Sequence, residues 1–306
     1  MSENFVFSLP LLSPFAIFSE DRRWLGITKL ENFVFLFVSA LAFRYLCRQT
    51  LCTMILLSCA KTMNSRPVQN ETAGTTPRFA REAHELALAL ARRSPDELRR
   101  LLRVPAKIAA ENFNRYQAFH SPDTPSRPAL DAYTGIVFKT LLRGGFDATD
   151  RVYAQERLRI TSFLYGLLRP LDGIKPYRAE GDMVLPDWGG LSLFDYWKPR
   201  LTDLFEQEIK ASGGVLFNLA SDEMRRLFDW KRLEERTHII TPQFQIRHND
   251  GWKTVVVYTK MARGAMARYL LKERIETPHA LEAFEWEGFR FDAARSDNYN
   301  YIFTHE

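Results

Sequence analysis

Three short apolar runs dominate the hydrophobic pattern downstream of residue 53, at residues 55–57, 215–219 and 254–258. Runs of this length are typical of strands buried on both faces of a largely parallel sheet that helices cover. Polar side chains follow each run: Ser58 and Lys61 after the first, Ser221, Asp222 and Glu223 after the second, Lys260 and Arg263 after the third.

Ligands bind beyond the carboxyl ends of the strands in open sheets of this kind. We therefore expect the three run ends to face one cleft. Taken singly, Ser221 or Asp222 also has a simpler interpretation, as a helix N-cap or a solvated loop end.

The stretches between these runs carry helical periodicity. Ser94 is the expected N-cap of one helix, because Pro95 follows at the first helical position and two acids occupy the first turn. Near the carboxyl terminus, "FEWEGFRFD" alternates in polarity, which predicts a late strand with one polar face. The spacing of apolar residues predicts helices over 78–92, from Pro95 to about Leu102, 106–119 and 192–211.

The first 53 residues contain the most apolar run of the chain, "FVFLFVSALAF" at 33–43. A helix needs about 20 apolar residues to cross a bilayer, so we expect no stable membrane insertion. A secretion signal is disfavoured, because acidic residues stand where a short basic region is required. We interpret residues 1–53 as a poorly ordered extension or a start-site misassignment, with translation beginning at Met54.

Composition excludes little by itself. The 306 residues are 46% hydrophobic and 26% charged, as in a soluble globular protein, and the net charge of +5 is mild. Cys47, Cys52 and Cys59 have no metal-ligand spacing, so we expect a reducing compartment and no metal site. The common hydrolase, zincin, phosphate-loop and dinucleotide signatures are missing, and no cofactor is indicated.

Prolines fix a cluster of charged groups in "LYGLLRPLDGIKPYRAE", residues 164–180. Arg169, Tyr177, Arg178 and Glu180 could form an anion site in which an arginine grips phosphate or carboxylate. The same residues could instead form structural ion pairs, Arg169 with Asp172 and Arg178 with Glu180. Composition leaves both interpretations open.

Two further stretches are cationic. In residues 259–274, helical geometry puts Lys260, Arg263 and Arg274 on one side with Arg268 and Lys272 beside them, against the single acid Glu273. The start of this helix would add its positive dipole end for an anion. In residues 92–116, two helices joined at "RVPAK" could hold a DNA backbone as a helix-hairpin-helix does; the cations concerned are Arg99, Arg100, Arg103, Lys107 and Arg115.

Several motifs in one order resemble the YaaA family of bacterial peroxide-stress proteins: "MILLSCAKT", "AYTG", "LYGLLRPLD", "PYRAE", "LFDYW", "FNLASDE", "KMARGAMARY" and "FEWEGFRFD". The resemblance covers essentially all of residues 54–306. Two departures from the family pattern are Cys59, where proline is usual, and Met224, where an aromatic residue is common.

The resemblance implies an α+β fold: a single domain, 54–306, with a mixed, largely buried β-sheet wrapped by helices, including a helix-hairpin-helix-like element. It also implies a cytoplasmic protein that binds DNA through a positively charged cleft and limits oxidative DNA damage. Its motifs place the cleft residues at Lys61, Arg169, Tyr177, Arg178, Glu180, Ser221, Glu223, Lys260, Arg263 and Arg268.

Two function classes follow. The first is a monomeric DNA-binding protein of the peroxide response that contacts the phosphates of double-stranded DNA with little base preference. The alternative is an enzyme that acts on a phosphorylated or nucleotide-like small anionic ligand in the same cleft, with Lys61 and Glu180 available for acid–base chemistry. A flat basic groove would favour DNA, and a narrow pocket would favour the enzyme.

Overall fold

The structure, a computed structural model, describes residues 53–64, 74–185, 189–249 and 251–306. The predicted extension therefore lies almost wholly outside the described residues. A mixed sheet has the strand order β4-β3-β1-β6-β7-β10-β9, with β8 paired to β7. Its strands are β1 (Thr53–Leu57), β3 (Leu158–Ser162), β4 (Gly166–Leu168), β6 (Val215–Leu219), β7 (His238–His248), β8 (Gly251–Lys253), β9 (Arg290–Phe291) and β10 (Asn300–His305).

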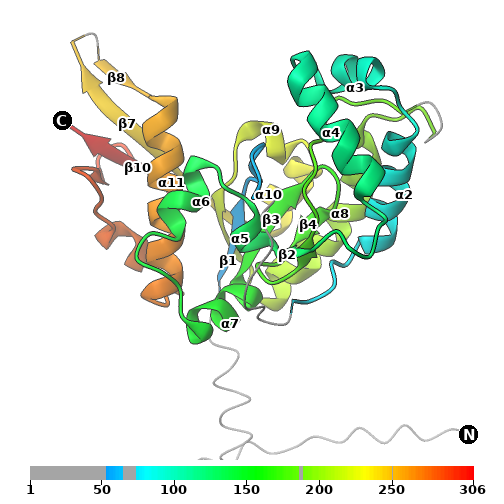
Figure 1. The fold of residues 1–306 in the computed structure, drawn as a ribbon. Helices are drawn as coiled ribbons and strands as arrows, with labels where there is room; N and C mark the ends of the chain where they lie inside the picture. The colour runs from blue at the N-terminus through cyan, green and yellow to red at the C-terminus, as the bar shows by residue number, and fades with distance from the viewer. Residues whose placement is uncertain (1–52, 65–73, 186–188, 250) are drawn as a thin grey trace, which may run out of the picture. The chain divides into compact units, whose positions relative to one another are not determined.

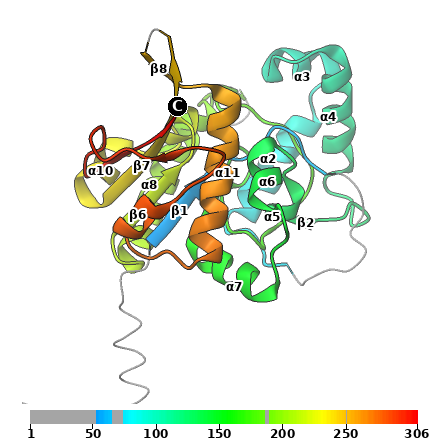
Figure 2. The ribbon, with the colours of Figure 1, turned by 90° about the vertical axis from the view of Figure 1, so that its left-hand side faces the viewer.

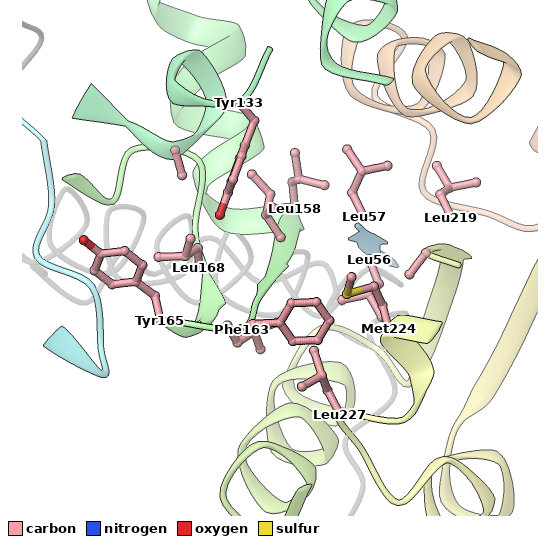
Figure 3. Packing of buried hydrophobic residues seen from close by; sticks show 14 of the residues in the cluster. Leu56, Leu57, Tyr133, Leu158, Phe163, Tyr165, Leu168, Leu219, Met224 and Leu227 are labelled. Atoms are coloured by element: carbon pink, nitrogen blue, oxygen red, sulfur yellow. The ribbon is translucent and has the colours of Figure 1, made fainter. Parts of the chain in front are cut away.

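The middle of this sheet is parallel. Strand β1 lies between β3 and β6, β6 pairs with β7, and β7 with β10, all in parallel, whereas β4, β8 and β9 are antiparallel additions. Every residue of β1 and of β6 is buried, as their continuous apolar runs predicted. Figure 3 shows Leu56, Leu57 and Leu158 of β1 and β3 among the buried side chains of the core.

The prediction of a third strand at residues 254–258 is wrong. Helix α11 (Val256–Lys272) begins inside that run, and its first turn is exposed: Val256 by 66% and Val257 by 48%. A short apolar run has no period that separates a strand from a helix end, and here no layer covers it. The helix also starts a full turn before Lys260, so its first N–H groups do not lie at Lys260 and Arg263 as expected.

The helices predicted over 78–92, from Pro95 to about Leu102, over 106–119 and over 192–211 are confirmed. Ser94 is the N-cap, because its Oγ atom accepts a hydrogen bond from the Glu97 amide. The Ser94 amide in turn donates to the Glu97 carboxylate, which completes a capping box. The helices are α2 (Ala80–Ala91), α3 (Pro95–Leu102), α4 (Ala106–Ala118), α5 (Ala129–Ala132), α6 (Ile136–Leu141), α7 (Ala148–Arg157), α8 (Leu193–Ala211), α9 (Asp222–Arg225), α10 (Trp230–Arg236), α11 and the 3₁₀ helix η2 (His279–Ala283).

Helices cover both faces of the sheet (Figures 1 and 2). Helices α8 and α10 pack on one face, and α7 and α11 on the other, with α6 against α11. Gly264 permits this last contact, because a Cβ atom there would lie 2.3 Å from the Val137 carbonyl oxygen. A small separate ladder joins β2 (Arg127–Pro128) to β5 (Gly173–Ile174).

The expected late strand is mostly a turn. Only Arg290 and Phe291 form a strand, because Glu287 and Gly288 take positive φ angles of 47° and 84° and reverse the chain. Trp286 and Phe289 close this turn through their backbone groups. The glycine within the alternating pattern marks the reversal, since glycine adopts positive φ at low cost.

No helix within the described ranges is both long and apolar enough to cross a bilayer. Residues 33–43, the apolar run considered from the sequence, lie outside those ranges.

Candidate anion-binding site

The chain changes direction within the sheet at β1. From β1 it passes through α2–α7 to β3 on one side, then returns through α8 to β6 on the other. Such a reversal leaves a crevice beyond the carboxyl ends of the strands, where open α/β sheets bind their ligands. Figure 1 shows β1 and β3 side by side, and α9 follows β6 directly in the chain.

A cavity of about 300 Å³ lies at this place, and we call it the strand-tip pocket. It is lined from the tip of β1 by Ser58 to Thr62, and from farther along the chain by Gly135 to Val137, Phe163 and Met224. Seven of the ten cleft residues expected from the sequence also line it: Lys61, Tyr177, Arg178, Ser221, Glu223, Lys260 and Arg263.

Glu180 connects two cations at the rim. Its Oε2 atom lies 2.7 Å from Lys61 Nζ, and its Oε1 atom lies 3.2 Å from Arg178 Nη2. The Lys61 side chain is 54% exposed, whereas that of Glu180 is 15% exposed. One carboxylate therefore faces two positive charges. The Arg178–Glu180 ion pair considered from the sequence is present, and Arg178 lines the pocket all the same.

Helix α11 contributes Lys260 and Arg263, which lie one turn apart. Lys260 is exposed and Arg263 is half-buried. The Nε atom of Arg263 is buried, and among the described residues it has no hydrogen-bond acceptor. Burial lowers the pKa of Arg263, with Asp222 acting in the opposite direction. A buried donor without an acceptor favours a ligand that supplies one.

Two serines join the tips of β1 and β6. The Ser221 amide donates to Ser58 Oγ at 2.9 Å, and Ser221 also precedes the short helix α9 as its N-cap residue. Glu223 lines the same pocket. Four cations (Lys61, Arg178, Lys260 and Arg263) thus stand against two carboxylates (Glu180 and Glu223), which leaves the site electropositive.

Tyr177 lines the pocket and is hydrogen-bonded to two neighbours that do not line it, Tyr133 and Ser162. Tyr177 Oη lies 2.8 Å from Tyr133 Oη and 2.6 Å from Ser162 Oγ, and all three residues are buried. Burial raises the pKa of both tyrosines well above its usual value. Sequence reasoning gave no role to Tyr133 or Ser162. The "AYTG" motif, which holds Tyr133, is the signal that could have pointed to the first.

Cys59 stands in the pocket with its amide donating to Thr161 Oγ1 at 3.3 Å. Burial, followed by the negative charge of Glu223, raises the pKa of this thiol to about 12. The thiolate is the reactive form of cysteine, so this environment keeps the sulfur unreactive.

Two of the expected residues lie elsewhere. Arg169 bonds Asp172 at 3.0 Å and the Thr76 carbonyl, so the structural ion pair considered from the sequence is what forms. Arg268 donates to the Gly145 carbonyl at 3.1 Å and packs over Phe146. Neither lines the strand-tip pocket.

The carboxyl end of the cationic stretch 259–274 also departs from the expected face. The helix ends at Lys272, and Arg274 follows with φ 54°. Lys272 and Arg274 both bind buried Asp150 of α7, at 2.5 and 3.0 Å. These two cations are therefore paired with an acid that is remote in sequence. Arg274, which lies beyond the end of the helix, does not share a face with Lys260 and Arg263.

Helices α3 and α4 lie side by side, joined at Arg103–Pro105 (Figures 1 and 2). Arg99, Arg100, Arg103 and Lys107 are exposed, whereas Arg115 is half-buried and pairs with Glu111 at 2.5 Å. The pair is attached to the pocket rim, because Tyr116 of α4 donates to the Arg178 carbonyl. That these helices hold DNA as a helix-hairpin-helix stays a prediction.

No cluster of His, Cys, Asp and Glu suited to a metal ion occurs among the residues described.

Comparison with known proteins identifies the family of this chain. The family model described as "Peroxide stress protein YaaA" matches residues 53–295. The chain belongs to the YaaA family. This confirms the resemblance drawn from the motifs.

Curated relatives in the YaaA family are UPF0246 proteins. One from Bacteroides thetaiotaomicron is 56% identical over 250 residues, which is 82% of this chain and 97% of the relative. One from Bacteroides fragilis is 57% identical over 251 residues, covering 82% and 98%. A more distant one from Porphyromonas gingivalis is 45% identical over 255 residues, covering 83% and 100%. The YaaA family match thus includes every element that builds the strand-tip pocket.

Proposed function

We propose that this YaaA-family protein acts in peroxide defence by holding DNA through its phosphates across the mouth of the strand-tip pocket. The observation that carries the proposal is the convergence of Lys61, Arg178, Lys260 and Arg263, from three separate segments, on one hollow with two carboxylates. Arginine and lysine neutralise DNA phosphates and release counterions, which supplies affinity without base specificity.

The exposed cations of α3 and α4 extend this surface. Arg103 lies 3.8 Å from Asp182, and Asp182 also binds Arg226 at 3.1 Å, so the bend between α3 and α4 adjoins the end of α9. The Tyr116–Arg178 bond fixes α4 to the same rim. A DNA backbone that crosses the pocket mouth can therefore reach both the cations of the strand-tip pocket and those of α3 and α4.

The size of the pocket determines what can enter it. At about 300 Å³ it stands at the lower end of the range for ligand pockets, about 300–1,000 Å³, whereas the major groove of a duplex alone is about 12 Å wide. Duplex DNA would therefore stay at the rim. The interior can accept only a single anionic group or one displaced nucleotide.

A titration of DNA binding against salt tests the proposal. The four cations of the strand-tip pocket alone should make the logarithm of the binding constant fall against the logarithm of salt concentration with a slope of roughly −3.6. Each cation of α3 and α4 that also contacts a phosphate should steepen the slope by about 0.9. Lys260→Gln and Arg263→Gln should each reduce this slope by about one. Arg143→Gln, which removes a 76% exposed arginine outside the pocket, is the control and should change nothing. A flat salt dependence would contradict the proposal.

The enclosed shape of the pocket favours a second candidate, an enzyme acting on a phosphorylated or nucleotide-like small molecule in the same place. Lys61 and Glu180, 2.7 Å apart, would be its acid–base pair. This candidate predicts turnover that disappears in Lys61→Gln, together with phosphate-containing ligands that compete with DNA. The first function is supported instead if the protein binds DNA and shows no turnover that the Lys61→Gln substitution removes.

A further inference from the structure

A second and larger cavity, of about 620 Å³, lies beside the strand-tip pocket, and we call it the lateral pocket. Strand β6 ends at Leu219, whereas its neighbour β7 continues to His248. The cavity occupies the flank of β7 that β6 leaves open, between α9, α10, α11 and the start of β10. Of the residues that the sequence assigned to the cleft, only Arg263 lines it.

Arg263 lies between the two cavities and lines both. Helix geometry explains this position. Thr259, four residues earlier on α11, faces the lateral pocket, and Lys260, three residues earlier, faces the strand-tip pocket. Within the described chain, the Arg263 guanidinium has no ion pair, and its buried Nε has no acceptor.

The lateral pocket is lined by two arginines, Arg225 and Arg263, and by two acids, so its formal charges balance. Arg225 lies 3.0 Å from Asp222 and 3.9 Å from Glu234, so this arginine has two acids of its own. Arg263 makes no ion pair within the described chain, so its guanidinium is open to an anionic group, although Asp222 acts on it electrostatically. A guanidinium suits a phosphate or carboxylate, because its planar N–H groups match two oxygens at once. The pocket therefore fits a molecule with one anionic group.

An aromatic ring also lines the lateral pocket. Tyr299 lines the pocket, is 59% exposed, and meets His238 in a T-shaped contact at 5.5 Å. Thr241 and Thr254 also line the pocket with hydroxyl groups, and Asn300 lines it with an amide that is hydrogen-bonded to Gln243 and Asp297. Exposed aromatic rings stack on nucleobases, and neighbouring hydroxyls and amides can hydrogen-bond a sugar or a base edge.

We propose that the lateral pocket binds a nucleoside monophosphate, with its phosphate on Arg263 and its base against Tyr299. The volume lies inside the usual range for pockets that take ligands of this size. A further consequence rests on the proposed DNA binding: because Arg263 serves both cavities, nucleotide and DNA compete for one guanidinium, and each weakens the other by the same factor.

Calorimetric titration of the full chain tests the binding with three probes: AMP, adenosine and inorganic phosphate. AMP should bind more tightly than either of its parts. Arg263→Gln should weaken AMP at least tenfold. Tyr299→Ala should weaken AMP severalfold while inorganic phosphate is unaffected, and Arg143→Gln should change nothing.

The exposed position of Tyr299 makes Tyr299→Ala the decisive variant if Arg263→Gln fails to fold. Absence of saturable AMP binding overturns the proposal, as does AMP binding that both variants leave unchanged. Equal affinity for AMP and inorganic phosphate overturns the assignment of a nucleotide.

A competition experiment separates this inference from the proposed function. Increasing AMP should lower DNA affinity in the wild-type protein, and much less in Tyr299→Ala. AMP binding with no effect on DNA overturns the coupling through Arg263. If the protein fails to bind DNA at all, the proposed function fails, and the AMP titrations still decide on the lateral pocket.

Discussion

Lys61 and Glu180 are 119 positions apart in the chain, and their side chains meet at 2.7 Å. The loop after β1 and the turn after Pro176 are thereby joined at the rim of the strand-tip pocket. Because Glu180 also bonds Arg178, a single carboxylate moderates two cations that line the pocket.

Glu180→Gln should strengthen DNA binding. Removing this carboxylate leaves Lys61 and Arg178 uncompensated, so affinity at low salt should rise roughly threefold to tenfold, corresponding to about 1 kcal/mol. The salt dependence should steepen at the same time. Fluorescence anisotropy with a labelled duplex measures both.

Glu285→Gln is the matched control, since Glu285 is a 64% exposed acid that pairs with Arg290 and lines no part of the strand-tip pocket. Weaker DNA binding by a folded Glu180→Gln protein would show that Glu180 orders the rim rather than moderating its charge.

The sequence predicted the local elements well and the long-range pairing poorly. Strands β1 and β6 and helices α2, α3, α4 and α8 follow from continuous apolar runs, from periodicity and from caps such as Ser94. Strand β7 was missed, because its pattern is mixed and Pro242 lies inside it. The strand predicted at 254–258 is wrong for the opposite reason. The run is continuously apolar, but an apolar sequence alone does not show that another layer of the fold covers it.

The candidate site was predictable where strand ends determine position. Lys61 and Ser221 follow the buried strands β1 and β6, and topology brings them together. Arg263 reaches the same pocket from helix α11, although the run before it is not a strand. Arg169 and Arg268 could not be placed in this way, because their orientation depends on partners, Asp172 and the Gly145 carbonyl, that only the folded chain supplies. The whole lateral pocket was invisible, since it depends on the unequal lengths of β6 and β7.

Cys59 should resist modification. Its thiol has a pKa raised to about 12 by burial and by Glu223, so very little thiolate exists near neutral pH. Iodoacetamide should label Cys59 far more slowly in the native protein than in urea, and peptide mapping distinguishes it from Cys47 and Cys52. Glu223→Gln should raise the native rate modestly. Labelling of native Cys59 as fast as a free thiol would contradict this account.

Gly264→Ala should destabilise the fold. In a helix, alanine normally gains about 1 kcal/mol over glycine. Here the added Cβ would lie 2.3 Å from the Val137 carbonyl oxygen, and overpacking of this kind costs about 1–3 kcal/mol. Because the obstructing atom belongs to the backbone of α6, the clash should outweigh the gain. Urea unfolding of Gly264→Ala and Gly264→Ser should show a graded loss, and an alanine variant more stable than wild type would refute the close contact.

Glu206 should make stability depend on acid pH. Bonds from Lys210, Arg232 and Arg236 lower the pKa of this carboxyl from 4.5 to about 2. The unfolded chain therefore takes up a proton more readily, and the contribution of Glu206 is complete above about pH 4.5 and is lost as pH falls through about 2. The difference in unfolding free energy between wild type and Glu206→Gln should shrink over that interval.

Glu85→Gln offers a comparison for this pH series, because Glu85 is 54% exposed and has only a 3.9 Å contact with Arg81. Its difference from wild type should stay small throughout. A Glu206→Gln difference that is constant from pH 7 to pH 3 would show that the surrounding cations do not depend on the charge of Glu206.

Tyr177, with Tyr133 bonded to it, and Cys59 form a wall of the strand-tip pocket that does not exchange protons under cellular conditions. Burial keeps Tyr133, Tyr177 and Cys59 in their neutral forms, so this wall contributes no titrating charge between mildly acidic and mildly alkaline pH. A phosphodiester, which has no ionisation in that interval, would meet the same wall at every pH. A phosphate monoester has a second ionisation near pH 6, so its own charge would make binding depend on pH. The pH dependence of binding therefore distinguishes a phosphodiester ligand from a phosphate monoester.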